Sequence, residues 1–388
     1  MKRVYRYLIS ANITNLLVTF YMIFFMWKIA KSLESAFYVG IIPVLDSIAL
    51  LLSPLPQGFL IDKFRKTPLL ISSNLGIVII LAILYFSTSL VTIYVAGFSL
   101  AFFSFFSLSV SNAFAKDNVV KGQMLKYSAY SNIAYSGSSL IGNGAGAILT
   151  YMSTSDGILI LIGISLSSLL LSVSRRESMP ERHFSQDIKK STSTREILAV
   201  VKAIAPVLLV ELILNGTTSS VDVFEASYVA LTLKGTSLDY TLFVVGFPIG
   251  KIVASTFVLK YEAFCGRFGG IIVPVISGLA ILVLSFDSLA ATLIAISLII
   301  GFLTPIIAIP VITKLRNLIP KEMFGRVSSI SNVIRNGPSP VFYGSYSYTS
   351  LYFPIPVILR FVGIVMIIFS PLSQKILGKF YNNSQEQQ

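Results

Sequence analysis

Long apolar segments alternate with short polar ones along almost the whole chain. Twelve of these segments are apolar enough to cross a bilayer as an α-helix, which takes about 20 residues. They lie near residues 8–30, 37–61, 68–88, 91–115, 125–150, 156–174, 200–230, 239–261, 269–286, 289–313, 325–349 and 354–375. The pattern predicts an all-α polytopic membrane protein with twelve transmembrane helices.

One polar stretch is much longer than the others and divides the apolar segments into two sets of six. It predicts a domain organisation in four parts. These are an N-terminal six-helix bundle (1–174), a cytoplasmic linker (175–199), a C-terminal six-helix bundle (200–380) and a polar tail (381–388).

The two sets of six are related in sequence. Identical or similar residues recur at a spacing of 200 positions around the fifth and eleventh segments. The pairs are Lys126 and Arg326, Ser128 and Ser328, Ser131 and Ser331, Asn132 and Asn332, and Gly137 and Gly337. An internal duplication of this kind predicts two pseudo-symmetric halves, as in transporters that rock one half against the other.

The composition agrees with a membrane protein and narrows its chemistry. Only 12% of residues are charged, against about 25% in soluble domains. The net charge of +13 comes from short loops between apolar segments, so we expect no nucleic-acid partner. With one cysteine, Cys265, and one histidine, His183, we expect no metal site and no cofactor.

The Gly246–Lys251 stretch is one residue too short for a phosphate-binding loop, and we expect a protein that is not an enzyme.

The distribution of basic residues predicts the orientation. Most of the 30 Lys and Arg residues lie at the amino terminus, in the loops after even-numbered segments and in the tail, whereas Lys28, Lys31 and Lys234 lie in opposite loops. Cytoplasmic loops carry the excess of positive charge. We therefore expect a plasma-membrane protein with both termini in the cytoplasm.

The loop between the second and third segments carries a family resemblance. Gly58, Asp62, Lys63 and Lys66 resemble the loop signature of the major facilitator superfamily, from which Arg65 and Thr67 depart. The resemblance implies two six-helix bundles that alternate access to a central site. It also implies a conformational latch, in which Asp62 pairs with the start of the eleventh helix.

Two further features resemble a branch of that superfamily, the macrolide-efflux-like and siderophore-exporter-like transporters. Residues 320–326 resemble the entry to the eleventh helix in this branch. The fifth segment carries glycines resembling an exporter motif, at positions 137, 142, 144 and 146, although Asn143 replaces its proline. Close helix packing is the other explanation for these glycines. The fourth segment lacks the arginine of many proton-driven exporters, which weakens the case for proton exchange.

Ionisable groups inside a membrane cost at least about 2.5 to 3.5 kcal/mol each, so they are candidate functional groups. In the seventh segment, polar residues recur at steps of three and four and share one helical face. They are Glu211, Asn215, Thr218, Asp222 and Glu225. Asp222 is the best-placed carboxylate for a proton or a cation, with Glu211 second. A buried structural hydrogen bond is the other interpretation of Asp222. Asn215 and Gly216 suggest a break in this helix.

Other charged residues fall within the predicted helices. Asp46 and Lys251 occupy neighbouring positions of the two repeats, and their pairing is a hypothesis. The other interpretation is that Lys251 extends to the membrane interface or pairs locally. Arg335 lies on a polar face of the eleventh segment. The residues expected to line the pathway are Asn12, Asn15, Thr19, Asn132, Tyr135, Asn215, Thr218 and Asn332.

Together these features predict a secondary active transporter, and they favour proton-coupled efflux of small amphipathic or cationic compounds. Its partners would be a small-molecule substrate, protons and the lipid bilayer, and we expect a monomer. One alternative is an importer of organic anions or metabolites anchored by Arg335 and Lys251. An alternative of another class is a membrane receptor or assembly partner that kept the fold without transporting.

Overall fold

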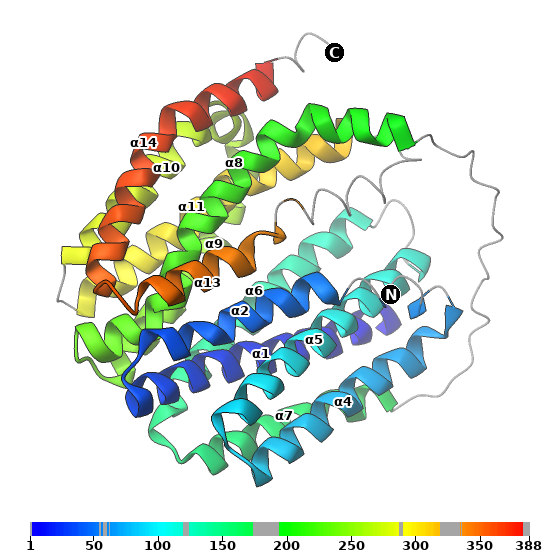
Figure 1. The fold of residues 1–388 in the computed structure, drawn as a ribbon. Coiled ribbons are helices and arrows are strands. Elements are labelled where there is room, and N and C mark those ends of the chain that lie inside the picture. The colour runs from blue at the N-terminus through cyan, green and yellow to red at the C-terminus, as the bar shows by residue number, and fades with distance from the viewer. Residues whose placement is uncertain are drawn as a thin grey trace. The chain divides into compact units, whose positions relative to one another are not determined.

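The computed structural model describes residues 2–53, 56, 60–61, 63–118, 124–173, 194–286, 290–318, 334 and 336–382. Within these ranges the chain forms twelve α-helices and no β-strand, which confirms the predicted fold class (Figure 1). The helices are α1 (Lys2–Leu33), α2 (Ala36–Leu52), α4 (Lys66–Phe86), α5 (Leu90–Asn118), α6 (Met124–Ile148), α7 (Thr154–Val173), α8 (Thr194–Ser227), α9 (Ser237–Lys260), α10 (Glu262–Phe286), α11 (Ala290–Leu318), α13 (Ser339–Thr349) and α14 (Ile355–Asn382). A 3-10 turn, η2 (Leu149–Tyr151), follows α6, and a π-helical turn, η3 (Tyr228–Thr232), follows α8.

The helices have the length and composition of membrane spans. In the part of the chain that is described, nine are long and apolar enough to cross a bilayer, and α2 is a shorter apolar helix. Several contain an internal proline, which transmembrane helices tolerate better than soluble ones. These prolines are Pro43, Pro206, Pro248, Pro274, Pro305, Pro310 and Pro371.

The chain divides into two compact units. The first unit comprises Met1–His183 and Val229–Thr241, and the second comprises Phe184–Tyr228 and Leu242–Gln388. Residues 174–193, which make up most of the predicted linker, lie outside the described residues. Helix α8 begins at Thr194, so the last residues of the predicted linker are helical.

Helix α1 is the centre of the first unit, where it contacts α2, α5, α6 and α7. From Phe20 to Trp27 it is apolar on every side, and Leu17, Phe24 and Phe25 are completely buried. A helix that is apolar all round is expected at such a central position.

Glycines let α6 lie directly against α1. A Cβ atom on Gly142 would meet the Leu16 carbonyl oxygen at 2.5 Å, and one on Gly146 would meet the Phe20 carbonyl oxygen at 2.7 Å. This is the spacing by which small residues bring transmembrane helices together. By contrast, a Cβ atom on Gly137 would meet nothing within 4 Å.

A buried polar cluster joins α1, α4 and α7. The Asn74 side-chain amide donates to the hydroxyl oxygens of Ser172 at 2.6 Å and Ser10 at 3.1 Å. The Ser10 hydroxyl also bonds to that of Ser168 at 3.0 Å. Hydrogen bonds of this kind hold helices together where lipid offers no alternative partner.

The segment of the first unit that comes from residues 229–241 also packs on α1. The ring of Tyr240 stacks on that of Trp27 with centroids 5.0 Å apart, and its hydroxyl donates to the Ile23 carbonyl at 3.4 Å. The Lys31 ammonium lies 5.1 Å from the centre of the Trp27 ring. These contacts fix the first turn of α9 in the first unit.

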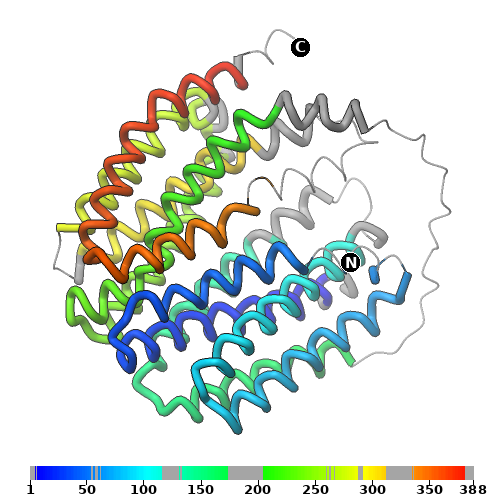
Figure 2. Tube along the Cα trace, in the orientation of Figure 1, coloured from blue at the N-terminus to red at the C-terminus, as the bar shows by residue number. Residues whose placement is uncertain are grey.

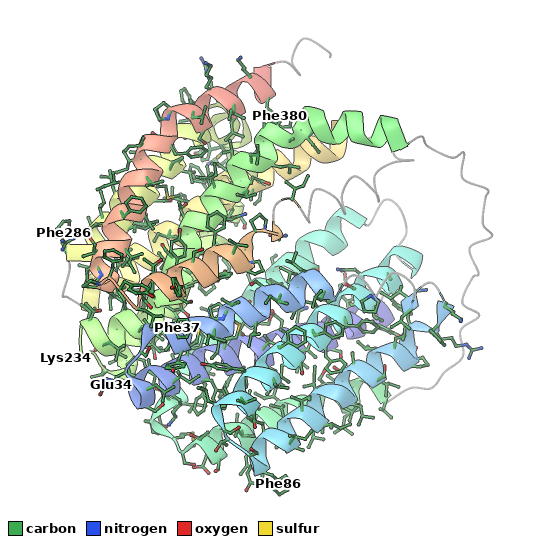
Figure 3. All side chains as sticks on the ribbon, viewed as in Figure 1. Glu34, Phe37, Phe86, Lys234, Phe286 and Phe380 are labelled. Carbon is green, nitrogen blue, oxygen red and sulfur yellow. The ribbon has the colours of Figure 1, made fainter. Side chains whose placement is uncertain are left out.

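In the second unit, α8 contacts α10, α11, α13 and α14. Helices α10 and α14 run side by side along their length (Figure 2). They approach closely at Gly278 and Gly363, where a Cβ atom on either glycine would lie 2.7 to 2.8 Å from the other's carbonyl oxygen. Phe286 lies at the end of α10 (Figure 3). The Arg360 guanidinium stacks 4.1 Å from the centre of its ring.

Candidate functional site

The candidate site lies in the second unit and is built on α8. Helix α8 runs unbroken from Thr194 to Ser227, so the predicted break at Asn215 and Gly216 is wrong. The reason is packing. The Gly216 carbonyl accepts a hydrogen bond from the Tyr346 hydroxyl at 3.0 Å, and a Cβ atom at Gly216 would meet the Phe342 ring at 2.5 Å. The missing side chain therefore makes room for α13 and does not end the helix.

Asp222 is the carboxylate of the site. Its side chain is partly buried on α8 and accepts a hydrogen bond from the Tyr343 hydroxyl of α13 at 3.3 Å. It also interacts electrostatically with the Lys251 ammonium of α9. Three helices of one unit therefore bring together a carboxylate, an ammonium group and a phenol.

Lys251 has a second contact, with an aromatic ring. Its ammonium lies 4.2 Å from the centre of the Phe247 ring, one turn earlier on α9. A cation over an aromatic face is attracted by the ring quadrupole. We call Asp222, Lys251, Tyr343 and Phe247 the Asp222 site.

Tight packing holds the backbone beneath Lys251. Gly250 precedes it and faces α11, where a Cβ atom would overlap the Leu298 carbonyl and lie 2.7 Å from the Phe302 amide. The glycines of the Gly246–Lys251 stretch therefore serve helix packing. The Lys251 side chain therefore projects from a closely packed part of α9.

Aromatic residues of α13 cover α8 beside the site. The Tyr346 ring lies 6.4 Å from that of Phe224 and 6.5 Å from that of Phe342, measured between centroids. The sequence-based prediction missed Tyr343 and Tyr346. Their spacing of three residues puts them on one helical face, but it does not show which helix that face meets.

The other carboxylates of α8 differ in exposure. The Glu211 side chain is only 4% exposed, whereas Asp222 and Glu225 are partly exposed. The Thr218 hydroxyl donates to the Leu214 and Asn215 carbonyls of its own helix at 3.1 and 3.0 Å. Asp222 combines partial exposure with partners on two other helices.

The first unit holds a second carboxylate with a tyrosine neighbour. Asp46 of α2 is partly buried and interacts electrostatically with Tyr135 of α6. Lys251 has Asp222 as a neighbour in its own unit, and the pairing of Asp46 with Lys251 stays a prediction.

The predicted polar stripe of α1 makes structural hydrogen bonds. The Asn15 amide donates to the hydroxyl oxygens of Ser138 and Ser139 at 2.8 and 2.9 Å, and so joins α1 to α6. Asn12 and Thr19 donate to carbonyls of their own helix, at 2.7 and 3.0 Å. Their place along a pathway stays a prediction.

Several predicted residues lie outside the described part of the chain. They are Gly58, Asp62, Asn332 and Arg335, together with the side chain of Asn132. Of the predicted latch, Lys63 is exposed and Lys66 begins α4. Among the described residues, no three His, Cys, Asp or Glu side chains come together in a way that could hold a metal ion.

The fold and the intramembrane charges point to a transporter, and the comparison of sequences identifies the family. The sequence model of the Major Facilitator Superfamily matches residues 8–342. The chain belongs to the Major Facilitator Superfamily. No curated protein sequence is similar enough to match the chain.

Solved structures of superfamily transporters share the fold over nearly the whole chain. A mutant of the nucleoside transporter NupG matches with a TM-score of 0.74 and 13% identity, over 96% of this chain and 98% of that one. An auto-inhibited POT family peptide transporter matches with a TM-score of 0.72 and 13% identity, over 96% of both chains. The POT family transporter PepTSo matches with a TM-score of 0.70 and 12% identity, over 100% of this chain and 99% of that one. At these identities the likeness shows the fold, which is that of a multi-pass membrane transporter.

Proposed function

We propose that this superfamily member is a secondary active transporter that exports small amphipathic or cationic compounds in exchange for protons, by alternating access. The observation that carries the proposal is the Asp222 site. A carboxylate inside a membrane helix is costly, and this one is partly exposed and has partners on two other helices. A site that binds either a cation or a proton, but not both, couples their movements.

Asp222 suits this role better than Glu211. A substrate has to reach the carboxylate, and Glu211 is only 4% exposed. Asp46, which is partly buried beside Tyr135, would assist in the first unit.

The surroundings of Asp222 suit an amphipathic cation. Phe247 already holds an ammonium group on its ring face, and Tyr343 adds a phenol. Aromatic faces next to a carboxylate attract organic cations through their quadrupole and their apolar area.

The outward direction rests on the resemblance of residues 320–326 to the efflux branch. Packing against α1 explains Gly142 and Gly146, so these glycines do not distinguish an exporter from an importer. The localisation in the plasma membrane, with both termini cytoplasmic, rests on the positive-inside rule.

A second candidate is the import of organic anions or metabolites. The observation that favours it is the ammonium of Lys251 within the same site, because an anion could anchor there and on Arg335. A receptor without transport activity would bind such ligands without moving them.

Ethidium retention tests the proposal. Cells that express the wild type, Asp222→Asn or Glu34→Gln would be loaded with ethidium, with and without a protonophore. Glu34 is an exposed carboxylate beyond the end of α1 and serves as the control. We expect the wild type and Glu34→Gln to lower the dye content, Asp222→Asn to fail, and the protonophore to abolish the difference.

Other outcomes separate the alternatives. If no variant changes retention under any condition, export of organic cations is rejected, and anionic metabolites are tested for Lys251-dependent uptake into proteoliposomes. Ligand binding without flux in the same proteoliposomes would identify a receptor.

A further inference from the structure

The positive charge of Lys251 affects the net charge of the Asp222 site when a cation binds there. In the structure the ammonium of Lys251 offsets the carboxylate of Asp222. A cationic substrate bound at Asp222 would leave the site with one excess positive charge. An uncompensated charge within the membrane is strongly disfavoured, so the site needs a way to lose it.

We infer that Lys251 is the proton carrier of the exchange: a cation that binds Asp222 displaces the lysine, which then releases its proton. This inference rests on the proposed function, because it assumes that the site moves cations. In chemical terms, Asp222 carboxylate with Lys251 ammonium plus a substrate cation becomes Asp222 carboxylate with the cation, Lys251 amine and a free proton. The N–H bond of the ammonium breaks, and the proton passes to water on the side to which the site is open.

The same steps in reverse complete the cycle. When the cation leaves on the other side, the amine takes up a proton there and the ammonium returns to Asp222. The site is neutral in both states, so one monovalent cation exchanges for one proton and no net charge crosses the membrane.

The ring of Phe247 stays beside the lysine when a cation takes its place at Asp222. The ring of Phe247, one turn away on α9, already lies 4.2 Å from the Lys251 nitrogen. Gly250 packs closely on α11, and the flexible four-carbon side chain of Lys251 can move away from Asp222 without a movement of the helix. Once a cation occupies Asp222, a neutral amine beside the ring leaves no charge unpaired, whereas an ammonium there would have lost its carboxylate partner.

The groups around Lys251 fit this role. Among the described residues, α8 presents Asp222, with Glu225 one turn further along, and α13 presents the Tyr343 phenol. At the contact with Gly250, α11 presents Leu298 and Phe302, which are apolar. Asp222 is therefore the charged group whose occupation by a cation would most affect Lys251.

Purified full-length protein in proteoliposomes tests the inference, with ethidium as the cation and an internal pH dye to count protons. We expect wild type to move one proton per ethidium, at a rate that an imposed membrane potential does not change. This measurement needs no variant. An exchange that responds to the potential overturns the inference.

Two substitutions of Lys251 give the sharper test. An arginine side chain keeps the positive charge but cannot release its proton, so Lys251→Arg should slow the exchange at least tenfold. In Lys251→Met the ethidium should still run down its gradient, now without proton movement and with a rate that follows the membrane potential. Lys260→Arg, an exposed lysine at the end of the same helix, is the matched control and should behave like wild type.

The outcomes distinguish this inference from the proposed function. Uphill, proton-driven export that persists in Lys251→Met would show that Asp222 itself carries the proton; the inference would fail and the proposed function would stand. If wild type moves no ethidium under any gradient, the proposed function fails and this inference fails with it.

Discussion

The Tyr343 hydroxyl of α13 donates a hydrogen bond to the Asp222 carboxylate of α8 over 3.3 Å. This is longer than the usual 2.7 to 2.8 Å between hydroxyl and acceptor oxygens. The phenol therefore orients the carboxylate without saturating it, which leaves lone pairs for Lys251 or for a substrate cation.

Tyr343→Phe should weaken cation transport moderately. A hydrogen bond of this kind contributes about 0.5 to 1.5 kcal/mol, so we expect a roughly two- to tenfold rise in the ethidium concentration that gives half-maximal flux. Tyr348→Phe is the control, since Tyr348 is exposed on the same helix and bonds to Tyr352 instead. Equal effects of the two substitutions would argue against a role of Tyr343 at Asp222.

Asp222 and Lys251 should be coupled in a double-mutant cycle. Lys251→Met leaves the carboxylate without its ammonium partner, and adding Asp222→Asn removes that penalty. We expect a coupling energy of roughly 0.5 to 3 kcal/mol in the unfolding free energy measured in detergent. The same cycle with Asp46→Asn in place of Asp222→Asn tests the pairing predicted from the repeat. Coupling of Lys251 to Asp46 alone would favour that pairing.

Gly142→Ala should destabilise the first unit. The new methyl group would meet the Leu16 carbonyl oxygen at 2.5 Å. Overpacking of this kind lowers the free energy of unfolding by about 1 to 3 kcal/mol. Gly137→Ala on the same helix is the matched control, because nothing lies within 4 Å of the added carbon. Thermal unfolding of the purified variants compares them, and equal losses would contradict the proposed α1–α6 contact.

Asn74→Ala should loosen the contact between α1, α4 and α7. It removes the donor of two hydrogen bonds, to Ser10 and Ser172, each worth about 0.6 kcal/mol in a membrane protein. We expect a loss of about 1 to 2 kcal/mol by the same unfolding measurement. Asn112→Ala, at an exposed position of α5, should leave stability unchanged. A loss at Asn112 as large as at Asn74 would show that the buried cluster has no special role.

The duplication read from the sequence has a counterpart in the backbone. Glu34, directly after α1, and Lys234, after η3, are 200 positions apart, and both have left-handed φ angles, of 48° and 52° (Figure 3). Each follows the first helix of its half, at a point where the chain turns towards the next helix. The repeat therefore extends beyond the residue pairs around the fifth and eleventh segments.

Local sequence patterns were enough to predict the helices and the candidate carboxylate. Burial of about 20 apolar residues in lipid is a local property of a segment, and the face that carries Asp222 follows from helical periodicity alone. The surroundings of Asp222 depend on the three-dimensional fold, because Lys251 and Tyr343 reach it from α9 and α13. The fold also decided that α8 stays helical at Gly216, since the Tyr346 hydroxyl and the Phe342 ring come from a distant part of the chain. Hydropathy and spacing describe one helix at a time, whereas the partners of a charge depend on which helix faces meet.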